Sequence, residues 1–189
     1  MRVGLLGGSF NPAHAGHLHV ARTALARLGL DQVWLLVSPG NPLKPALGMA
    51  PLADRLASAR TIGDGRRIVA TAIEAALGTR FTVDTLRELR RRFPRIHFVW
   101  LMGADNLAQL PRWRRWQDIV GAMPFAVLPR PTYNHRALAS RAALRLRPHR
   151  RAAREAGLLA ATTPPSWTYL STRQHHASAT AIRRQAMGE

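Results

Sequence analysis

Short apolar runs alternate along the chain with segments in which apolar residues recur at helical spacing. Runs without polar alternation indicate strands buried on both faces, and they occupy residues 3–6, 33–37, 67–70, 96–102, 125–128 and 167–170. Helical spacing occupies residues 16–28, 52–62, 82–93 and 135–146, and a further helix opens at Ser178. Strands that alternate with helices favour βαβ units. The pattern therefore predicts an α/β fold with a Rossmann-like, doubly wound, mainly parallel sheet and helices on both faces.

Glycine and proline mark the breaks between these elements. Gly29 stands where the helix over 16–28 needs a C-terminal cap, and Pro94 ends the helix for which Thr82 is the predicted N-cap. Residues 38–51 contain four prolines and two glycines, which predicts a loop. No internal repeat and no linker-like segment divides the chain. We therefore expect one domain over residues 1–189, with its last helix over about 178–187.

The composition excludes several classes of protein. The chain has no cysteine, which excludes a disulfide framework, a thiolate zinc site and a cysteine nucleophile. Its apolar runs are far shorter than the roughly 20 residues of a membrane-spanning helix, and the apolar N-terminal run is too short for a signal peptide. We expect a cytoplasmic protein without a membrane partner.

The charge is strongly basic and unevenly distributed. The chain carries 28 basic and 10 acidic residues, a formal net charge of +18, and Lys44 is its one lysine beside 27 arginines. Residues 1–64 have six basic and three acidic groups, whereas residues 65–189 have 22 and seven. Clustered arginine is compatible with nucleic-acid binding. The aromatic residues of the basic part are not interleaved as a stacking platform requires, which disfavours a nucleic-acid partner.

The segment from Gly7 to His17 concentrates candidate chemistry. It follows the first predicted strand and opens the first predicted helix, where free backbone N–H groups and the helix dipole favour an anion. Its glycines allow a close approach of the main chain, although it is neither a dinucleotide-binding fingerprint nor a P-loop. Imidazoles of His14 and His17 at this place can donate to phosphate oxygens. The loop contains no cysteine or carboxylate that would complete a metal site, so we expect no metal held by the protein.

Four segments resemble those of one family. His14-Ala15-Gly16-His17 matches the His-x-Gly-His signature of the nucleotidyltransferase superfamily, and the preceding Gly-Gly-Ser-Phe-Asn-Pro resembles the bacterial nicotinate-nucleotide adenylyltransferases. Residues 82–86 are similar to the Tyr-Thr-x-Asp-Thr-Leu segment of that family. Gly103-Ala104-Asp105 followed by Trp113, and residues 178–183, resemble its two later motifs. Each later motif is weak alone, whereas four in the correct order are a strong signal.

The resemblance implies an enzyme of NAD biosynthesis. It would transfer the adenylyl group of ATP, bound with Mg²⁺, to nicotinate mononucleotide, giving nicotinate adenine dinucleotide and pyrophosphate. The implied catalytic residues are His14, His17 and Lys44. The implied ATP and phosphate contacts are Gly7, Gly8, Ser9, Phe10, Ser178, Thr180 and Arg183, and Arg130 joins them because it follows a strand at the ligand-binding edge of an α/β sheet. The implied contacts to nicotinate mononucleotide are Thr85, Asp105 and the stacking Trp113.

The chain departs from the family pattern at several positions. Asn11 stands where many members have Asp, Ala179 replaces a Ser, and Arg114 follows Trp113 where an aromatic residue is common. A guanidinium beside the stacking Trp leads to the hypothesis that nicotinate is preferred over nicotinamide. Two alternatives remain open at this point. One is adenylyl transfer to another phosphate acceptor (nicotinamide mononucleotide or phosphopantetheine), and the other is a basic nucleic-acid-binding module. The sequence leaves open whether the chain forms a homo-oligomer.

Overall fold

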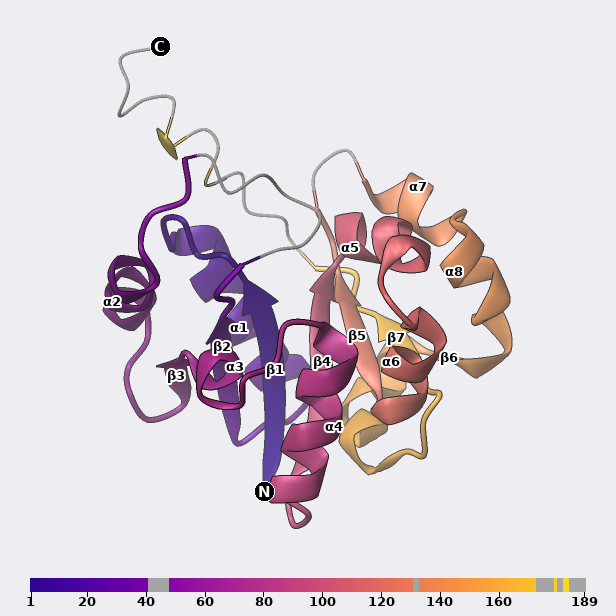
Figure 1. The fold of residues 1–189 in the computed structure, drawn as a ribbon. Coiled ribbons are helices and arrows are strands. Elements are labelled where there is room, and N and C mark those ends of the chain that lie inside the picture. The colour runs from indigo at the N-terminus through magenta and orange to yellow at the C-terminus, as the bar shows by residue number, and fades with distance from the viewer. Residues whose placement is uncertain (41–47, 131–132, 173–178, 180–181, 184–189) are drawn as a thin grey trace.

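A seven-stranded parallel sheet forms the centre of the molecule (Figure 1). The computed structural model describes residues 1–40, 48–130, 133–172, 179 and 182–183. The strand order is β3-β2-β1-β4-β5-β7-β6, and every neighbouring pair is parallel. The strands are β1 (Arg2–Gly8), β2 (Gln32–Val37), β3 (Ile68–Thr71), β4 (His97–Gly103), β5 (Phe125–Leu128), β6 (Arg150–Arg151) and β7 (Trp167–Tyr169).

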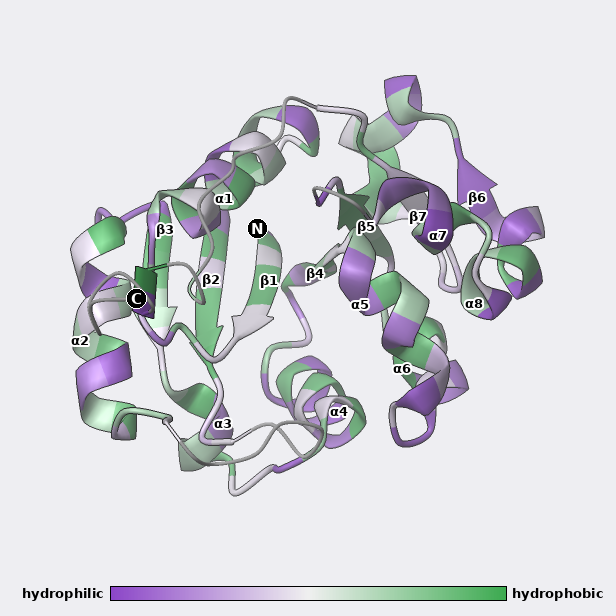
Figure 2. Ribbon diagram, turned by 90° about the horizontal axis from the view of Figure 1, so that it is seen from above, coloured by the Kyte–Doolittle hydropathy of each residue, from purple (hydrophilic) through white to green (hydrophobic). Residues whose placement is uncertain are grey.

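Helices cover both faces of this sheet, as the sequence predicts (Figure 2). Helices α4 (Thr82–Arg92), α5 (Ala104–Gln109), α6 (Trp116–Ala122), α7 (Asn134–Leu138) and α8 (Arg141–Arg145) share one apolar cluster with the sheet. Helices α1 (Ala15–Arg27) and α2 (Leu52–Ile62) and the 3₁₀ segment η3 (Ala153–Ala161) share the cluster on the opposite face. The Rossmann-like doubly wound architecture is therefore confirmed.

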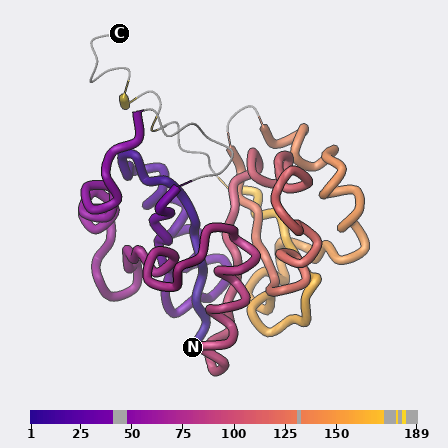
Figure 3. Tube along the Cα trace, in the orientation of Figure 1, coloured from indigo at the N-terminus to yellow at the C-terminus, as the bar shows by residue number. Residues whose placement is uncertain are grey.

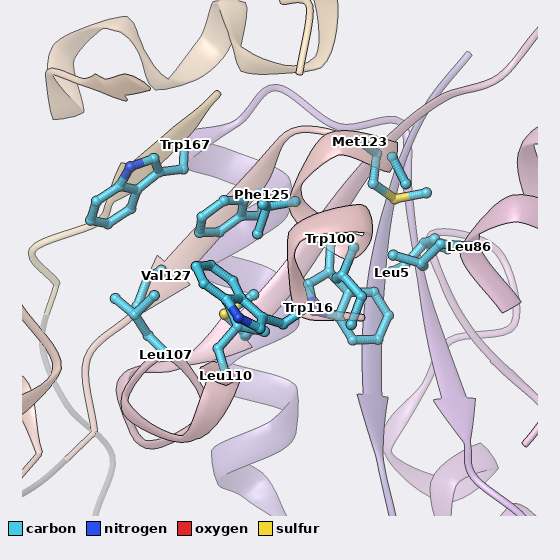
Figure 4. Close-up of a cluster of buried hydrophobic side chains, with 14 of the residues drawn as sticks. Leu5, Leu86, Trp100, Leu107, Leu110, Trp116, Met123, Phe125, Val127 and Trp167 are labelled. Carbon is cyan, nitrogen blue, oxygen red and sulfur yellow. The ribbon is translucent and has the colours of Figure 1, made fainter. Parts of the chain in front are cut away.

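Adjacent residues of the central strands bury their side chains on opposite faces. In β4, Phe98 and Trp100 belong to one cluster and Val99 to the other, as a strand covered on both sides requires. Figure 4 shows the first cluster, in which Phe125 of β5 stacks on Trp167 of β7 with ring centroids 5.5 Å apart. This continuous core explains why the strands read as unbroken apolar runs.

The short helices differ from the sequence expectation. The predicted helix over 135–146 is two helices, α7 and α8, because Ser140 caps α8 by accepting from the N–H of Ala143 at 3.3 Å. The N-cap of α4 is Phe81 without a side-chain hydrogen bond, so the prediction of Thr82 as its cap was wrong. Sequence periodicity missed α5, α6, α3 (Ile73–Ala76), the segments η1 (Leu110–Arg112), η2 (Arg147–His149) and η3, and the edge strand β6.

The tube in Figure 3 shows that the indigo and purple N-terminal residues form one half of the molecule and the orange and yellow residues form the other. Of the predicted helix over 178–187, Ala179, Ile182 and Arg183 are among the described residues, and all three are helical. In the described part of the chain, no helix combines the length and the apolar character needed to cross a membrane.

Candidate functional site at the carboxyl edge of the sheet

The order of the strands changes direction at β1, in the centre of the sheet. β2 and β3 follow on one side of β1, and β4 and the later strands lie on its other side. In open parallel sheets the crevice at such a switch point, outside the carboxyl ends of the strands, is the usual ligand site. The loops after β1, β4 and β5 carry most of the residues that the sequence singles out, and they meet at this edge (Figure 2).

The loop after β1 depends on two close approaches of the main chain. A Cβ added at Gly7 would lie 2.7 Å from the Trp100 ring, and one at Gly8 would lie 3.2 Å from the Phe10 ring. Phe10 itself has φ of +48° and is buried, which fixes the turn after Ser9. The sequence predicts glycines here for a close approach to a ligand, which stays a prediction; the structure adds that Trp100 and Phe10 occupy the space a Cβ would need.

His14 and His17 form a reciprocal cap at the start of α1. The Nδ1 of His14 accepts from the N–H of Gly16 at 3.1 Å, and the Nδ1 of His17 accepts from the N–H of His14 at 3.3 Å. The two rings lie with centroids 3.9 Å apart, and Phe10 supports the His17 ring at 4.7 Å. Because both Nδ1 atoms accept, the proton of each neutral imidazole resides on Nε2.

The environment of His17 keeps its imidazole neutral. Burial, and then the neighbouring His14 and Arg130, lower the pKa of His17 from 6.5 to about 3. At neutral pH this side chain therefore acts as a neutral hydrogen-bond donor through Nε2–H. Arg130, in the loop after β5, is thus close enough for its charge to act on His17.

Arg130 and Asp105 meet between β4 and β5. The Nε of Arg130 lies 3.8 Å from the Oδ1 of Asp105, and both atoms are buried without a hydrogen-bond partner in the described part of the chain. A Cβ at Gly103 would lie 2.3 Å from Asp105 Oδ1 and 3.1 Å from Arg130 Cγ. Gly103 thus provides the space in which the two side chains meet. The two side chains thus form an ion pair whose closest atoms have no hydrogen bond among the described residues.

Thr85 lies in the first turn of α4, and its hydroxyl is already engaged. Its side chain is fully buried, its Oγ1 donates to Glu74 Oε1 at 3.2 Å, and it lies 2.8 Å from the Oγ1 of Thr79. Burial raises the pKa of Glu74 despite hydrogen bonds from Thr85 and Ser38. The sequence did not single out Glu74, since an isolated Glu in a polar segment carries no motif.

Trp113 ends the segment η1 and is half-buried, so the expectation that it is not fully buried is confirmed. It packs against the first cluster, and its indole Nε1 is buried without a partner among the described residues. The next side chain, Arg114, lies over the Phe81 ring at 4.6 Å, with Arg80 at 5.8 Å from the same ring. Two guanidinium groups therefore flank the start of α4 beside Thr85 and Trp113.

Side chains of helix α2 form hydrogen bonds with the main chain of the loop after β1. Buried Arg55 donates to the carbonyl of Ser9 at 2.9 Å, and Ser58 Oγ accepts from the N–H of Ala13 at 3.0 Å. The side chain of Asn11 donates to the carbonyl of Gly48 at 2.9 Å. Sequence reasoning missed Arg55 and Ser58, because both occur in an ordinary amphipathic segment with no signature.

Several predicted site residues cannot be placed. Lys44, Ser178 and Thr180 lie outside the described residues. Arg183 is described, and its guanidinium donates to the carbonyl of Asn11, which brings the C-terminal segment to the loop after β1. Within the described ranges, no group of three His, Cys, Asp or Glu side chains is arranged to hold a metal ion.

Comparison with known sequences connects this edge to one family. Residues 5–185 match the family model described as cytidylyltransferase-like. The chain is 61% identical over 183 residues to a protein of Gluconobacter oxydans named "Probable nicotinate-nucleotide adenylyltransferase", covering 97% of this chain and 94% of that protein. It is 56% identical over 185 residues to a protein of the same name from Parvibaculum lavamentivorans, covering 98% and 92%.

Comparison with solved structures supports the fold. Nicotinic acid mononucleotide adenylyltransferase of Plasmodium falciparum, solved in complex with NaAD, is similar with a TM-score of 0.71. The match covers 97% of this chain and 82% of the other at 14% sequence identity. The same enzyme solved with APC has a TM-score of 0.70. At this identity the likeness establishes the common fold.

Proposed function

The chain belongs to the cytidylyltransferase-like family, among the nicotinate-nucleotide adenylyltransferases, and from this premise we propose that it transfers the adenylyl group of ATP to nicotinate mononucleotide. The observation that carries the proposal is the pair of capped histidines at the switch point of the sheet, facing Arg130. Nicotinate adenine dinucleotide and pyrophosphate are the products, and the reaction serves NAD biosynthesis.

The reaction requires positioning more than acid–base chemistry. An oxygen of the nicotinate mononucleotide phosphate attacks the α-phosphorus of ATP, a new P–O bond forms, and the bond to the pyrophosphate oxygen breaks. The attacking phosphate is already anionic near neutral pH, so no general base has to remove a proton. Catalysis then rests on aligning the two phosphates and stabilising the charge on the α-phosphate and the departing pyrophosphate.

We assign the donor side to the loop after β1. Nε2–H of His17 donates to the α-phosphate, and His14 donates to the neighbouring phosphates. The backbone of Gly7, Gly8, Ser9 and Phe10 lines the same loop, and Arg130, Lys44, Ser178, Thr180 and Arg183 complete the phosphate contacts. Because His17 is neutral, it contributes a directed hydrogen bond, while arginine and lysine contribute the positive charge. Mg²⁺ enters as part of the substrate complex with ATP, held mainly by phosphates and water.

We assign the acceptor side to the loop after β4 and the start of α4. The carboxylate of Asp105 accepts from ribose hydroxyls, and the indole of Trp113 stacks on the pyridine ring. Thr85 acts through the position of the α4 turn, since its hydroxyl is already engaged by Thr79, Glu74 and the carbonyl of Phe81. The carboxylate of nicotinate then lies near the positive start of α4, where the helix dipole favours an anion.

A pyrophosphate-release assay with a panel of acceptors tests the proposal. ATP with nicotinate mononucleotide is expected to release pyrophosphate with the highest kcat/KM, ahead of nicotinamide mononucleotide and phosphopantetheine. Release with phosphopantetheine alone would replace the proposed acceptor. Salt-dependent RNA binding without pyrophosphate release from any acceptor would instead support a nucleic-acid-binding module.

The acceptor preference can be traced to Arg114. We expect Arg114→Ala to lower the ratio of kcat/KM for nicotinate over nicotinamide mononucleotide by about tenfold, because a hydrogen bond to a charged group is worth about 1.5–3 kcal/mol. Arg112→Ala is the matched control, since it removes an exposed arginine from the same loop. An unchanged ratio in Arg114→Ala would assign the discrimination to the backbone of α4.

A further inference from the structure

Arg55 is a buried cation whose hydrogen bonds within the described part of the chain all go to main-chain carbonyls. It lies on α2 with 3% of its surface exposed. Its Nε donates to the carbonyl of Ala50 at 2.8 Å, and its Nη1 donates to the carbonyls of Ser9 at 2.9 Å and Ser38 at 2.7 Å. Its Nη2 donates to the carbonyl of Pro39 at 3.3 Å. One guanidinium thus joins the loop after β1 to both ends of the loop between β2 and α2.

No ion pair among the described residues neutralises the charge of Arg55. Burial lowers the pKa of Arg55, but a guanidinium remains protonated in proteins. A buried charge without a counter-ion is costly to retain unless it is well hydrogen-bonded. Its four carbonyl partners provide that hydrogen bonding, and its positive field extends to the neighbouring phosphate loop.

The contact with Ser9 also orients the next peptide group. The C=O and N–H of a trans peptide point in opposite directions. Because the Ser9 carbonyl points at Arg55, the N–H of Phe10 points away from α2. The turn at Phe10, with φ of +48°, and the Ser58 contact to Ala13 continue this support along the loop that ends in His14. α2 therefore fixes the main chain immediately before the signature histidines.

We propose that Arg55 is a positioning residue for adenylyl transfer, which fixes the phosphate loop after β1 against the loop between β2 and α2 and adds positive potential beneath the ATP phosphates. This inference rests on the proposed function of the same edge. Arg55 acts without touching substrate, because four of its five N–H donors are used by carbonyl groups and its side chain is buried. Its effect is therefore expected on ATP and on turnover, with little effect on the binding of the acceptor.

The test compares Arg55→Lys with Arg67→Lys. Arg67 also donates to two main-chain carbonyls, of Leu30 at 3.1 Å and Asp31 at 3.4 Å, but at the opposite end of the strands. We expect Arg55→Lys to raise KM for ATP about tenfold and to lower kcat about 10- to 100-fold, since misplacement by about 1 Å costs as much as 10²-fold. KM for nicotinate mononucleotide stays within about twofold, and Arg67→Lys leaves all three constants unchanged.

Two results would overturn the inference. The first is a folded Arg55→Lys enzyme with wild-type KM for ATP and wild-type kcat. The second is a loss of kcat that matches the unfolded fraction measured by circular dichroism, with both KM values unchanged, because this indicates a role in stability alone. Calorimetric titration with ATP tests the role of Arg55 independently of the proposed reaction. A wild type that binds ATP but releases no pyrophosphate would contradict the proposed function. A higher Kd for ATP in Arg55→Lys would still support Arg55 as a positioning residue.

A second variant covers the case in which Arg55→Lys does not fold. Ser58→Ala removes one hydroxyl from the same helix and leaves the N–H of Ala13 without its acceptor. We expect it to raise KM for ATP about two- to threefold, in line with the loss of one hydrogen bond of about 0.5–1.5 kcal/mol. Ser140→Ala, which removes a hydroxyl cap at α8, is the control and leaves KM for ATP unchanged. An unchanged KM in Ser58→Ala would remove α2 from the positioning of the loop.

Discussion

The signature histidines both use Nδ1 to accept a backbone N–H at the start of α1. The imidazole of His17 is uncharged at neutral pH, which leaves its Nε2–H as the donor. Burial, and then the neighbouring His14 and Arg130, explain the low pKa of His17. In the proposed reaction, neutral His17 supplies a directed hydrogen bond and the arginines supply positive charge.

His17→Ala is expected to lower kcat for adenylyl transfer by at least about 10²- to 10³-fold, the effect of removing one donor from a developing oxyanion. The fold should persist, since the cap from His14 to the N–H of Gly16 remains. Steady-state kinetics with circular dichroism checks both statements. His19→Ala, two residues further along α1, serves as the control and should retain near-normal turnover. Near-normal turnover in His17→Ala would remove His17 from the reaction.

At the scale of elements, the sequence predicts the layers and the donor loop but not the short helices. Every strand except β6 contains a mainly apolar run, so these six strands can be assigned without tertiary information, whereas β6 is a pair of arginines. α7 and α8 are separated by Ser140, whose role as a cap becomes visible only in the structure. The importance of Arg55 and Glu74 could not be predicted, because each depends on main-chain or side-chain partners distant in sequence. The roles of Lys44, Ser178 and Thr180 remain predictions from the resemblance.

Gly103→Ala tests the junction between β4 and α5. The φ of Gly103 is −74°, which any residue can adopt, so the alanine acts only through the steric contacts of its Cβ. The new Cβ would lie 2.3 Å from Asp105 Oδ1, and it would displace Asp105 and the adjoining Arg130. We expect kcat/KM to fall about 10- to 100-fold with a nearly unchanged melting temperature.

Gly121→Ala is the matched control for this change. No atom lies within 4 Å of a Cβ at Gly121, which is in α6. Alanine in a helix is favoured over glycine by about 1 kcal/mol, so this variant should be as stable as the wild type or more stable, with unchanged activity. Wild-type kcat/KM in Gly103→Ala would show that the position of Asp105 does not matter for the reaction.

At the scale of the whole molecule, the excess of arginine exceeds what the site requires. Of the net charge of +18, only Lys44, Arg130 and Arg183 belong to residues with a proposed phosphate contact. Seven further arginines lie between residues 136 and 154, on the far half of the sheet. A positive surface of this kind raises the rate at which anionic nucleotides encounter the protein. The positive net charge alone is equally compatible with nucleic-acid binding. The family was therefore identified by the sequence motifs and not by the charge.

The pH dependence of stability should contain two opposing contributions. The pKa of His17 is lowered from 6.5 in the unfolded chain to about 3 in the folded chain. Between these pH values the unfolded chain binds a proton that the folded chain does not bind. The contribution of His17 to the free energy of unfolding therefore decreases as the pH falls. The pKa of Glu74 is raised above 4.5, so the folded chain holds its proton longer, and this contribution to stability falls as pH rises.

Melting temperatures of His17→Gln and Glu74→Gln between pH 4 and pH 8 separate these contributions. We expect His17→Gln to lose less stability than the wild type when the pH falls from 6.5 toward 4. Glu74→Gln should gain stability relative to the wild type as the pH rises above 4.5, provided that its amide oxygen still accepts from Thr85. Parallel curves for the wild type and both variants would contradict both assignments.

The central place of β1 determines when the site forms during synthesis. β1 can pair with β2 as soon as residue 37 is available, but its other neighbour, β4, begins only at His97. The signature histidines are therefore among the first residues made, whereas Asp105 and Arg130 appear much later. Pairing of distant segments is slow, and domains complete their folding only when all central strands are present. A nascent chain shorter than about 130 residues thus carries the motif of the family without its nucleotide site.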